Sequence, residues 1–194
     1  MIARLALATN NRMKYLEFLS LWPPDAGELV CSPGLVSVPE TGYTYAQNAM
    51  LKAKAWAEFT GLPALADDSG LEVNALSGLP GIMSARIVEG TDADRNAWLL
   101  SQMEGQKNRH ASFFAAVALA LPDRTVVGFG VCRGKIGTAL EGESGFGYDP
   151  LFVPNGYSHS FGSLPKDVKN GISHRAVAVR NLLAALRDEG ILPR

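Results

Sequence analysis

Residues 111–133, ASFFAAVALALPDRTVVGFGVCR, contain two apolar runs separated by a short polar turn. The runs Ala111–Leu121 and Val126–Arg133 are long enough to form strands, and the intervening Pro122-Asp123-Arg124 is typical of a turn. This pattern predicts an antiparallel hairpin. Because a hairpin interrupts a strictly alternating order of strands and helices, we predict that the sheet containing it is mixed rather than wholly parallel.

Upstream of the hairpin, short apolar strands alternate with helical patterns. The segment Ile2–Ala8 is short and apolar, as expected for a buried first strand. A helix that stops before Pro23-Pro24 is predicted from Tyr15, Phe18, Leu19 and Trp22, which share one helical face. A second helix, ending near Gly61-Leu62-Pro63, is predicted from Ala46, Ala49, Met50, Ala53 and Ala57.

The rest of the chain continues to mix strands and helices. A buried strand is predicted at Ala64–Ala66, and we expect Asp67–Arg86 to be a functional loop because glycines and a proline interrupt it. Thr91 can cap a third helix that turns Trp98 and Leu99 inward. A final helix is predicted from Val179, Leu182, Leu183 and Leu186. The predicted fold class is therefore α/β with a mixed sheet.

Composition and charge limit the classes of protein that fit. The 194 residues are 47% hydrophobic, which suits one globular domain or two lobes that share a core. A net charge of -1 gives no global basic field, so we expect no nucleic-acid partner and no membrane partner. Cys31 and Cys132 match no disulfide framework, and the apolar run Phe113–Leu121 is well short of the roughly 20 residues of a spanning helix. With no basic leader before the first strand, we expect a cytoplasmic protein.

The loop between the first strand and the first helix is a candidate phosphate site. Backbone N–H groups at a helix N-terminus, a hydroxyl and a lysine can together cradle phosphate. The loop lacks the glycines of a Walker motif, so a capped helix start with a solvated lysine is the alternative. The candidate residues are Thr9, Asn10, Asn11, Arg12, Met13 and Lys14.

The run Asp67-Asp68-Ser69-Gly70 is a candidate metal site. Adjacent carboxylates at the predicted end of an apolar strand repel each other unless a cation or hydrogen bonds compensate them, and Mg²⁺ would do so. Magnesium would also neutralise a triphosphate and lower the pKa of an attacking water. Glu40 is a candidate third oxygen ligand. The alternative is a turn in which the acids are solvated.

Two further stretches carry groups that suit a nucleotide. In Gly145–Pro150, Phe146 can stack on a base and Asp149 can accept from base N–H groups, although a hydrophobic turn packed into the core is the alternative. In Lys169–Arg175, Ser173 can cap the last helix while basic side chains gather near its start, or that start is simply solvated. Phosphate cradle, metal site, stacking ring and basic cluster together predict a nucleoside triphosphate hydrolase.

Seven blocks in this sequence, in order and across nearly the whole chain, resemble the Ham1/RdgB family of inosine triphosphate pyrophosphatases. The blocks are Leu7-Ala8-Thr9-x-Asn11-x-x-Lys14, Glu40-Thr41-Gly42, Asn48-Ala49-x-x-Lys52-Ala53, Ala66-Asp67-Asp68-Ser69-Gly70-Leu71, Gly78-x-Pro80-Gly81-x-x-Ser84-Ala85-Arg86, Gly145-Phe146-Gly147-Tyr148-Asp149-Pro150-Leu151-Phe152 and Ile172-Ser173-His174-Arg175. The resemblance implies a single catalytic domain over 1–194, with two lobes around a curved mixed sheet, a central nucleotide cleft and a homodimer. It also implies Mg²⁺-dependent hydrolysis of dITP, ITP and XTP to the monophosphate and pyrophosphate, which removes them from the nucleotide pool.

The resemblance assigns a role to each candidate residue. Residues Thr9 to Lys14 would hold the phosphates, Asp68 would be the general base with a role in the metal site, and Ser69 would contact substrate. Asp67 and Glu40 would support or ligate Mg²⁺. The base would be surrounded by Phe146, Gly147, Tyr148 and Asp149, while base and phosphates would be held by Lys169, His174 and Arg175. Donors from Arg175 and the Lys169 region would satisfy O6 of a 6-oxo purine, which adenine lacks.

One residue departs from the family pattern, and two other classes compete. Gln47 stands where many relatives have Glu, so Mg²⁺ affinity is expected to be weaker if that Glu assists the metal. A Maf-like pyrophosphatase that acts on other nucleotides, including pyrimidines, is the nearest enzyme alternative. A regulatory module that binds nucleotide without turnover is the alternative from a different class. The intact Asp67, Asp68 and Lys14 disfavour the regulatory module.

Overall fold

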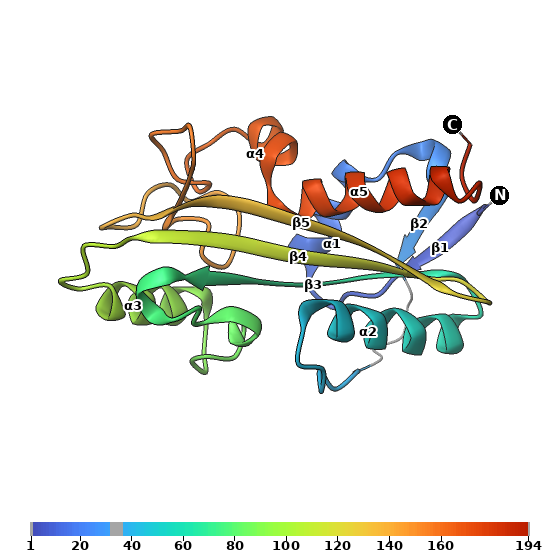
Figure 1. Ribbon diagram of the computed structural model, residues 1–194, viewed down its shortest axis with the longest axis horizontal. Helices are drawn as coiled ribbons and strands as arrows, with labels where there is room; N and C mark the ends of the chain where they lie inside the picture. The colour runs from blue at the N-terminus through green and yellow to red at the C-terminus, as the bar shows by residue number, and fades with distance from the viewer. Residues whose placement is uncertain (1, 32–36, 194) are drawn as a thin grey trace. The chain divides into compact units, whose positions relative to one another are not determined.

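The computed structural model describes residues 2–31 and 37–193, which contain a mixed six-stranded sheet (Figure 1). The strand order is β2-β1-β3-β4-β5-β6, with β1 parallel to β2 and to β3, and β5 antiparallel to β6. The strands are β1 Arg4–Leu7, β2 Glu28–Cys31, β3 Ala64–Val73, β4 His110–Ala120, β5 Thr125–Ile136 and β6 Phe152–Pro154. The α-helices are α1 Arg12–Leu21, α2 Tyr45–Thr60, α3 Asp92–Gln102, α4 Lys166–Ile172 and α5 His174–Asp188. The predicted α/β class with a mixed sheet is confirmed.

Local sequence signals account for most of these boundaries. The hairpin of β4 and β5 is present as predicted, with its turn closed by a 2.8 Å hydrogen bond from the Leu121 N–H to the Arg124 carbonyl. Thr91 and Asp94 form a capping box at the start of α3. Helix α2 ends at Gly61, which adopts the left-handed conformation that glycine tolerates best.

The chain divides into two compact units. The first unit comprises Met1–Asp68, Ala115–Gly130 and His174–Arg194, and the second comprises Ser69–Phe114 and Val131–Ser173. Strands β3, β4 and β5 each contribute residues to both units.

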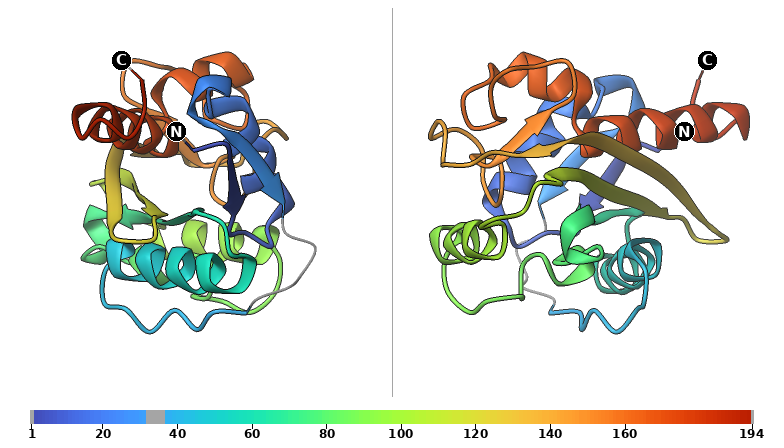
Figure 2. Two further views of the ribbon diagram at one scale, coloured as in Figure 1. Left: turned by 90° about the vertical axis from the view of Figure 1, so that its right-hand side faces the viewer. Right: turned by 60° about the vertical axis from the view of Figure 1, so that its left-hand side comes forward.

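In the first unit, the two faces of the sheet carry side chains of different size. Leu5 and Leu7 belong to a core shared with α1 and α5, whereas Ala6 and Ala8 belong to a core shared with α2. We call these the leucine face and the alanine face; Figure 2 shows α5 and α2 on opposite sides of the strands. The alternation follows from the two-residue period of a strand. It continues with Leu65, Val117 and Leu119 on the leucine face and Ala64, Ala66, Ala116 and Ala118 on the alanine face.

Two glycines of β5 let α5 lie against the backbone of the sheet. A Cβ atom at Gly130 would lie 2.0 Å from the His174 carbonyl oxygen, and one at Gly128 would lie 2.3 Å from the Ala178 carbonyl oxygen. Neither backbone atom can move aside easily, so only glycine permits this approach. The first turn of α5, which carries Arg175, is thereby fixed against the strand.

The second unit has its own aromatic core. Phe152 of β6 packs against Phe113 of β4 and against Phe161, with ring centroids 4.6 Å and 5.5 Å apart. Leu99 of α3 and Leu71 of β3 are fully buried in the same cluster. Aromatic contacts of this kind add to the free energy of burial and give the unit a fixed frame.

Three expectations require correction. Strand β3 continues to Val73, so Asp67 starts no loop; Leu71 and Val73 are buried with Glu72 less so, an alternation that Gly70 obscured. Leu19 is 45% exposed instead of facing the core, because its position on α1 turns away from the sheet. Ser173 directly precedes α5, as expected for its N-cap, but Lys169 does not lie at the start of that helix, because it belongs to a separate helix, α4.

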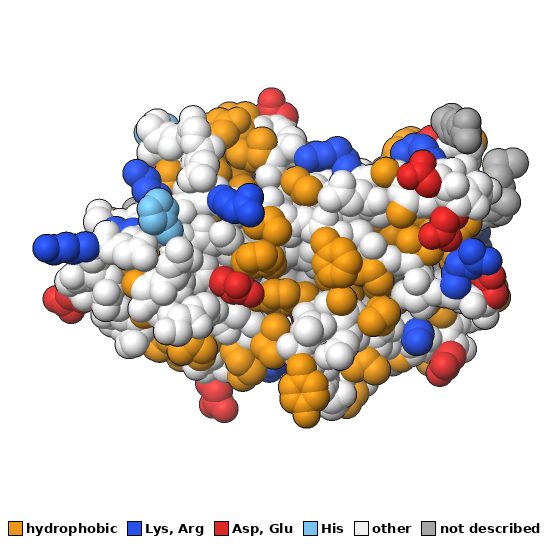
Figure 3. All heavy atoms as spheres, viewed as in Figure 1, with side chains coloured by type: hydrophobic (Ala, Val, Ile, Leu, Met, Phe, Trp, Pro, Cys, Tyr) orange, Lys and Arg blue, Asp and Glu red, His pale blue; other side chains and the backbone are white. Residues whose placement is uncertain are grey.

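The surface of the described residues carries charges of both signs. On the face shown in Figure 3, acidic and basic side chains are interspersed with apolar ones. No helix among the described residues is long and apolar enough to cross a bilayer.

Candidate active site

Two adjacent acids, Asp67 and Asp68, lie in the middle of β3 and are 2% and 6% exposed. Because successive side chains of a strand point to opposite faces, Asp67 follows Leu65 onto the leucine face and Asp68 follows Ala66 onto the alanine face. Each acid therefore has its own set of partners.

On the leucine face, Asp67 is held by two cations. Its Oδ1 lies 3.1 Å from Lys14 Nζ of α1, and its Oδ2 accepts from Nη2 and Nε of Arg175 at 3.1 Å and 3.2 Å. Arg175 also pairs with Glu17 of α1. We call Lys14, Glu17, Asp67 and Arg175 the leucine-face cluster. Burial alone would raise the pKa of Asp67, but Lys14 and Arg175 outweigh it and hold that pKa well below its usual range.

The start of α1 explains how Lys14 reaches this position. Asn11 is the N-cap, and its side-chain oxygen accepts from the N–H groups of Met13 and Lys14 at 2.9 Å and 3.2 Å. The Asn11 N–H in turn donates to Thr9 Oγ1 at 3.1 Å. This capped turn places Lys14 in the first turn of the helix, above the end of β1. Burial lowers the pKa of Lys14.

On the alanine face, Asp68 is held by α2. Its Oδ2 accepts from Asn48 Nδ2 at 3.0 Å, and its Oδ1 lies 3.5 Å from Lys52 Nζ. Lys52 also donates to Glu40 Oε1 at 2.6 Å, and Asn48 Oδ1 accepts from the Gly42 N–H at 2.8 Å. We call Glu40, Asn48, Lys52 and Asp68 the alanine-face cluster.

The pKa values of the two acids of β3 shift in opposite directions. Burial raises the pKa of Asp68; Lys52 lowers it, but Glu40 raises it again, and the net direction is upward. Asp67 shifts the opposite way. A carboxylate with a raised pKa is better suited to accept a proton than one with a lowered pKa.

The alanine-face cluster contains the oxygen atoms that suit a divalent cation. Glu40 and Asp68 flank one lysine ammonium, so two carboxylates already converge on a positive charge. Mg²⁺ commonly takes one or two protein carboxylates and completes its shell with phosphate oxygens and water. Among the described residues no group of three or more Asp, Glu, His or Cys side chains forms a self-sufficient metal site. The donor set therefore fits a cation that arrives with a phosphate ligand.

The second unit carries a separate turn that contains an aromatic ring and a buried ion pair. Asp149 Oδ2 accepts from Lys169 Nζ of α4 at 2.6 Å and from the Phe146 N–H at 2.8 Å. Lys169 Nζ also lies 5.2 Å from the centroid of the Phe146 ring. Tyr148 is buried, and its hydroxyl donates to the Ser84 carbonyl at 3.0 Å. Phe146 is half-buried.

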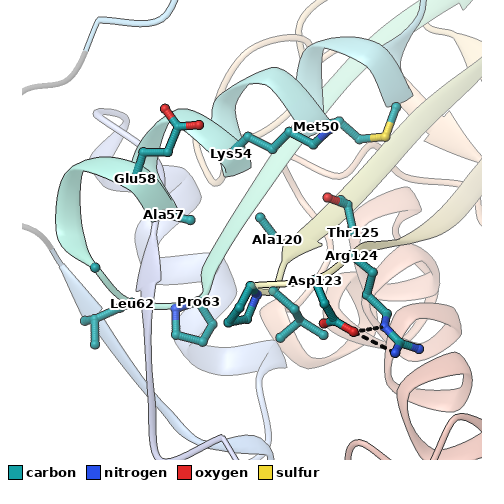
Figure 4. A pocket seen from close by; sticks show the side chains of 13 residues that line it. Met50, Lys54, Ala57, Glu58, Leu62, Pro63, Ala120, Asp123, Arg124 and Thr125 are labelled. Atoms are coloured by element: carbon teal, nitrogen blue, oxygen red, sulfur yellow. Dashed lines mark hydrogen bonds and ion pairs between the residues drawn. The ribbon is translucent and has the colours of Figure 1, made fainter.

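A hollow of about 750 Å³ in the first unit contains neither cluster. It lies between the C-terminal half of α2 and the turn that joins β4 to β5, as Figure 4 shows. Its charged residues include Lys54, Glu58 and the pair Asp123 and Arg124, whose Nη2 and Oδ2 are 2.7 Å apart at the surface. These exposed groups offer no buried base or nucleophile, so size alone does not mark this hollow as the active site.

Comparison with known proteins identifies the family. The model of the Ham1 family matches residues 5–185. The chain belongs to the Ham1 family. A relative in Desulforamulus reducens that is named dITP/XTP pyrophosphatase is 46% identical over 191 residues, which cover 94% of this chain and 95% of the relative.

Solved structures of Ham1 proteins share the fold. The HAM1 protein of Coxiella burnetii has a TM-score of 0.86 at 34% identity, with 96% of this chain and 100% of that chain covered. The Ham1 protein of Staphylococcus aureus has a TM-score of 0.84 at 36% identity, with 96% and 99% covered. The resemblance read from the seven sequence blocks is therefore confirmed at the level of family and fold.

In this Ham1 chain, the predicted site residues fall into groups that the sequence did not separate. His174 and Arg175 begin α5 in the first unit and are buried, whereas Lys169 lies in α4 of the second unit. Ser69 is half-buried on β3, directly after Asp68. The predicted phosphate loop surrounds the N-cap of α1, with Asn10, Arg12 and Met13 exposed.

Three residues of the leucine-face and alanine-face clusters, Asn48, Lys52 and Glu17, received no role in the sequence analysis. Asn48 and Lys52 are spaced i and i+4 on α2, a spacing that places both on the helix face toward β3 and could have indicated a shared function. Glu17 carries no comparable signal, because its partner Arg175 is 158 residues away. Gln47, the departure from the family pattern, is exposed and accepts from the Tyr43 N–H at 2.7 Å.

Proposed function

We propose that this Ham1 chain hydrolyses the non-canonical purine nucleoside triphosphates dITP, ITP and XTP to the monophosphate and pyrophosphate. The observation that carries the proposal is the pair of acids on opposite faces of β3, each set against a lysine. Lysines beside buried acids provide cationic donors for a triphosphate at sites where water is largely excluded. The relative named dITP/XTP pyrophosphatase supports the same substrate class.

In the proposed mechanism, Asp68 is the general base. Its Asn48 hydrogen bond fixes one carboxylate oxygen, which would orient the carboxylate to take up a proton from the water that attacks the α-phosphorus. We propose that Glu40 and Asp68 hold Mg²⁺. When bound, Mg²⁺ would neutralise charge on the triphosphate and lower the pKa of a water. Lys52 pairs with both carboxylates and would bind the same phosphates.

Asp67 has a supporting role in this proposal. It lies on the leucine face with Lys14 and Arg175, not beside Glu40, so its contacts favour support of the site over ligation of the metal. By fixing Lys14 it would present the ammonium, together with residues Thr9 to Met13, to the phosphates. Arg175 and His174 would act from the first turn of α5, where Glu17 and Asp67 hold the guanidinium in place.

The turn of the second unit would hold the base. We propose that Phe146 stacks on the purine, with Gly147, Tyr148 and Asp149 around it and Ser69 in contact with the substrate. Lys169 supplies an ammonium donor beside the ring, which suits O6 of a 6-oxo purine. Adenine carries an amino group at that position, so its binding would place one N–H donor against another, the Lys169 ammonium.

The remaining proposals concern assembly and location. We propose that the two units act as one catalytic domain over 1–194, that the protein is a cytoplasmic homodimer, and that neither nucleic acid nor membrane is a partner. The family resemblance supports the dimer, and the near-neutral net charge of -1 supports the absence of a polyanionic surface partner. Light scattering on a purified sample, which would give twice the 20.7 kDa chain mass, tests the dimer.

Release of pyrophosphate from a panel of nucleotides tests the function. The panel contains ITP, dITP, XTP, ATP, GTP, dTTP and UTP, each with Mg²⁺ and with EDTA. We expect strong turnover of the first three only with Mg²⁺. A preference for dTTP or UTP would support the Maf-like alternative, and binding without turnover would support a regulatory module.

A further inference from the structure

Side chains of helix α3 form hydrogen bonds with both the N–H and the carbonyl of Gly147, which lies in the turn that we assign to the base. Asp92 Oδ2 accepts from the Gly147 N–H at 2.6 Å, and Asn96 Nδ2 donates to the Gly147 carbonyl at 2.8 Å. Asp92 and Asn96 are one turn apart on α3, so they face the same side of the helix. Arg95 fixes Asp92 in turn, with its Nη2 2.6 Å from Asp92 Oδ1.

Gly147 has no side chain whose packing could fix its backbone. Its φ angle is +62°, and, apart from Gly147 itself and its two chain neighbours, no heavy atom of the described residues lies within 4 Å of the position that a Cβ would occupy. A glycine in open space can adopt many backbone conformations at similar free energy. The hydrogen bonds from α3 therefore select the conformation that the turn adopts between Phe146 and Tyr148.

Asn96 shows that this arrangement is maintained at a cost to stability. The residue is 4% exposed, and its Nδ2 donates both to the Asp92 carbonyl and to the Gly147 carbonyl. Among the described residues its buried Oδ1 has no hydrogen-bond partner. Burial of such an oxygen is unfavourable, and an apolar side chain of the same size would avoid it. The Asn96 amide is therefore better explained by its hydrogen bond to the Gly147 carbonyl than by a contribution to folding stability.

We propose that Asp92 and Asn96 are positioning residues for the purine base. They fix the Gly147 peptide, and through it they set the Phe146 ring, which precedes Gly147, and the Asp149 carboxylate, two residues after it. The proposal rests on the proposed function, because it takes this turn to be the base site. If the turn is loosened, binding of the base must also order it, so KM rises while the chemistry at Asp68 keeps its rate once substrate is bound.

The test compares four variants with the unmodified protein. Asp92→Ala and Asn96→Leu each remove one contact to Gly147, and Asp92→Asn keeps an acceptor oxygen for the Gly147 N–H. Asp94→Ala is the matched control: Asp94 accepts from the Thr91 N–H at 2.7 Å in the capping box of the same helix and makes no contact with Gly147. We expect Asp92→Ala and Asn96→Leu to raise KM for ITP about tenfold with little change in kcat. Asp94→Ala should stay close to the original KM, and Asp92→Asn should fall between it and Asp92→Ala, because the amide oxygen can still accept from Gly147 while the amide nitrogen no longer pairs with Arg95.

Amide hydrogen exchange over residues 145–149, measured without nucleotide, gives a second readout that does not depend on turnover. Exchange there should increase in Asp92→Ala and Asn96→Leu but not in Asp94→Ala. Unchanged exchange and unchanged KM in Asp92→Ala would overturn the proposal, as would equal effects in Asp94→Ala. If the unmodified protein does not turn over ITP, the proposed function fails, while the exchange data still decide whether α3 sets this turn.

Discussion

The leucine-face and alanine-face clusters are built around neighbouring acids, yet they differ in charge balance. Asp67 meets two cations, Lys14 and Arg175, and its pKa is lowered. Asp68 meets one lysine, an amide and the nearby Glu40, and its pKa is raised. Two acids that are adjacent in a strand therefore need not share a role, because their side chains point to opposite faces of the sheet. Asp67 is a buried anion between two cations, whereas we propose that Asp68 accepts a proton.

The largest expected effect comes from Asp68→Asn. The substitution keeps the volume and removes the proton acceptor, so we expect kcat for ITP to fall by roughly 10³-fold or more while nucleotide binding is largely kept. Steady-state pyrophosphate release and equilibrium titration with ITP measure the two quantities. A folded variant with near-normal kcat would show that Asp68 is not the base.

Asp67→Asn should mainly reduce stability. Removal of this buried anion leaves Lys14 and Arg175 with less compensation, so we expect the free energy of unfolding at pH 7 to fall by about 4 kcal/mol. Asp68→Asn should lose far less, because burial already disfavours the charged form of Asp68. Urea denaturation of both variants makes the comparison.

The difference in stability between the unmodified protein and Asp67→Asn should depend on pH. The pKa of Asp67 is lower in the folded state than its unfolded value of about 3.9, so its contribution is fully present above that value and is lost as pH falls through the folded pKa. The stability difference between the unmodified protein and Asp67→Asn should therefore shrink on acidification below about pH 4. A constant difference across the acid range would contradict the ion-pair explanation.

Glu17→Ala should weaken the leucine-face cluster from the other side. The Glu17 and Arg175 side chains are 11% and 2% exposed, so loss of one partner is expected to cost about 3 kcal/mol of unfolding free energy. Glu28→Ala is the control, because its pair with Arg4 is 69% and 60% exposed and should contribute less than about 1 kcal/mol. Thermal or urea denaturation that gives equal effects for both variants would refute a structural role for Glu17.

Phe146→Ala tests the division of labour between the acid clusters and the aromatic turn. Loss of stacking should raise KM for ITP by an amount equivalent to about 1 to 3 kcal/mol, with a much smaller change in kcat than in Asp68→Asn. Kinetics with ITP measure both parameters. An unchanged KM would place the base away from this ring.

The smallest expected effect comes from Gln47→Glu. The added carboxylate stands at the exposed start of α2, on the helix that carries Asn48 and Lys52, so we expect Mg²⁺ to bind a few-fold more tightly. The Mg²⁺ concentration for half-maximal turnover measures this. Gln47 accepts a hydrogen bond from the Tyr43 N–H at the start of α2. An unchanged Mg²⁺ concentration for half-maximal turnover would indicate that residue 47 acts only in this local contact.

Sequence patterns predicted the hairpin, the helices α1, α2, α3 and α5, and the family, but they did not predict α4 or separate the two acids. Strand β3 was expected to end at Ala66 because Gly70 follows, but it continues to Val73. Without that continuation, the two-residue alternation of a strand, which places Asp67 and Asp68 on opposite faces, could not be applied to these residues. The basic run Lys169–Arg175 was expected at the start of the last helix; Ser173, His174 and Arg175 are there, but Lys169 belongs to α4, which no pattern indicated. The pairing of Glu17 with Arg175 depends on the packing of α5 against Gly130, which no local pattern contains.

The most direct test of the central claim is hydrolysis of ITP in H₂¹⁸O, with mass spectrometry of both products. Attack of a water activated by Asp68 on the α-phosphorus places the label in IMP and leaves pyrophosphate unlabelled. We predict this result for the unmodified protein with Mg²⁺. Label in pyrophosphate, or release of labelled inorganic phosphate, would contradict the mechanism.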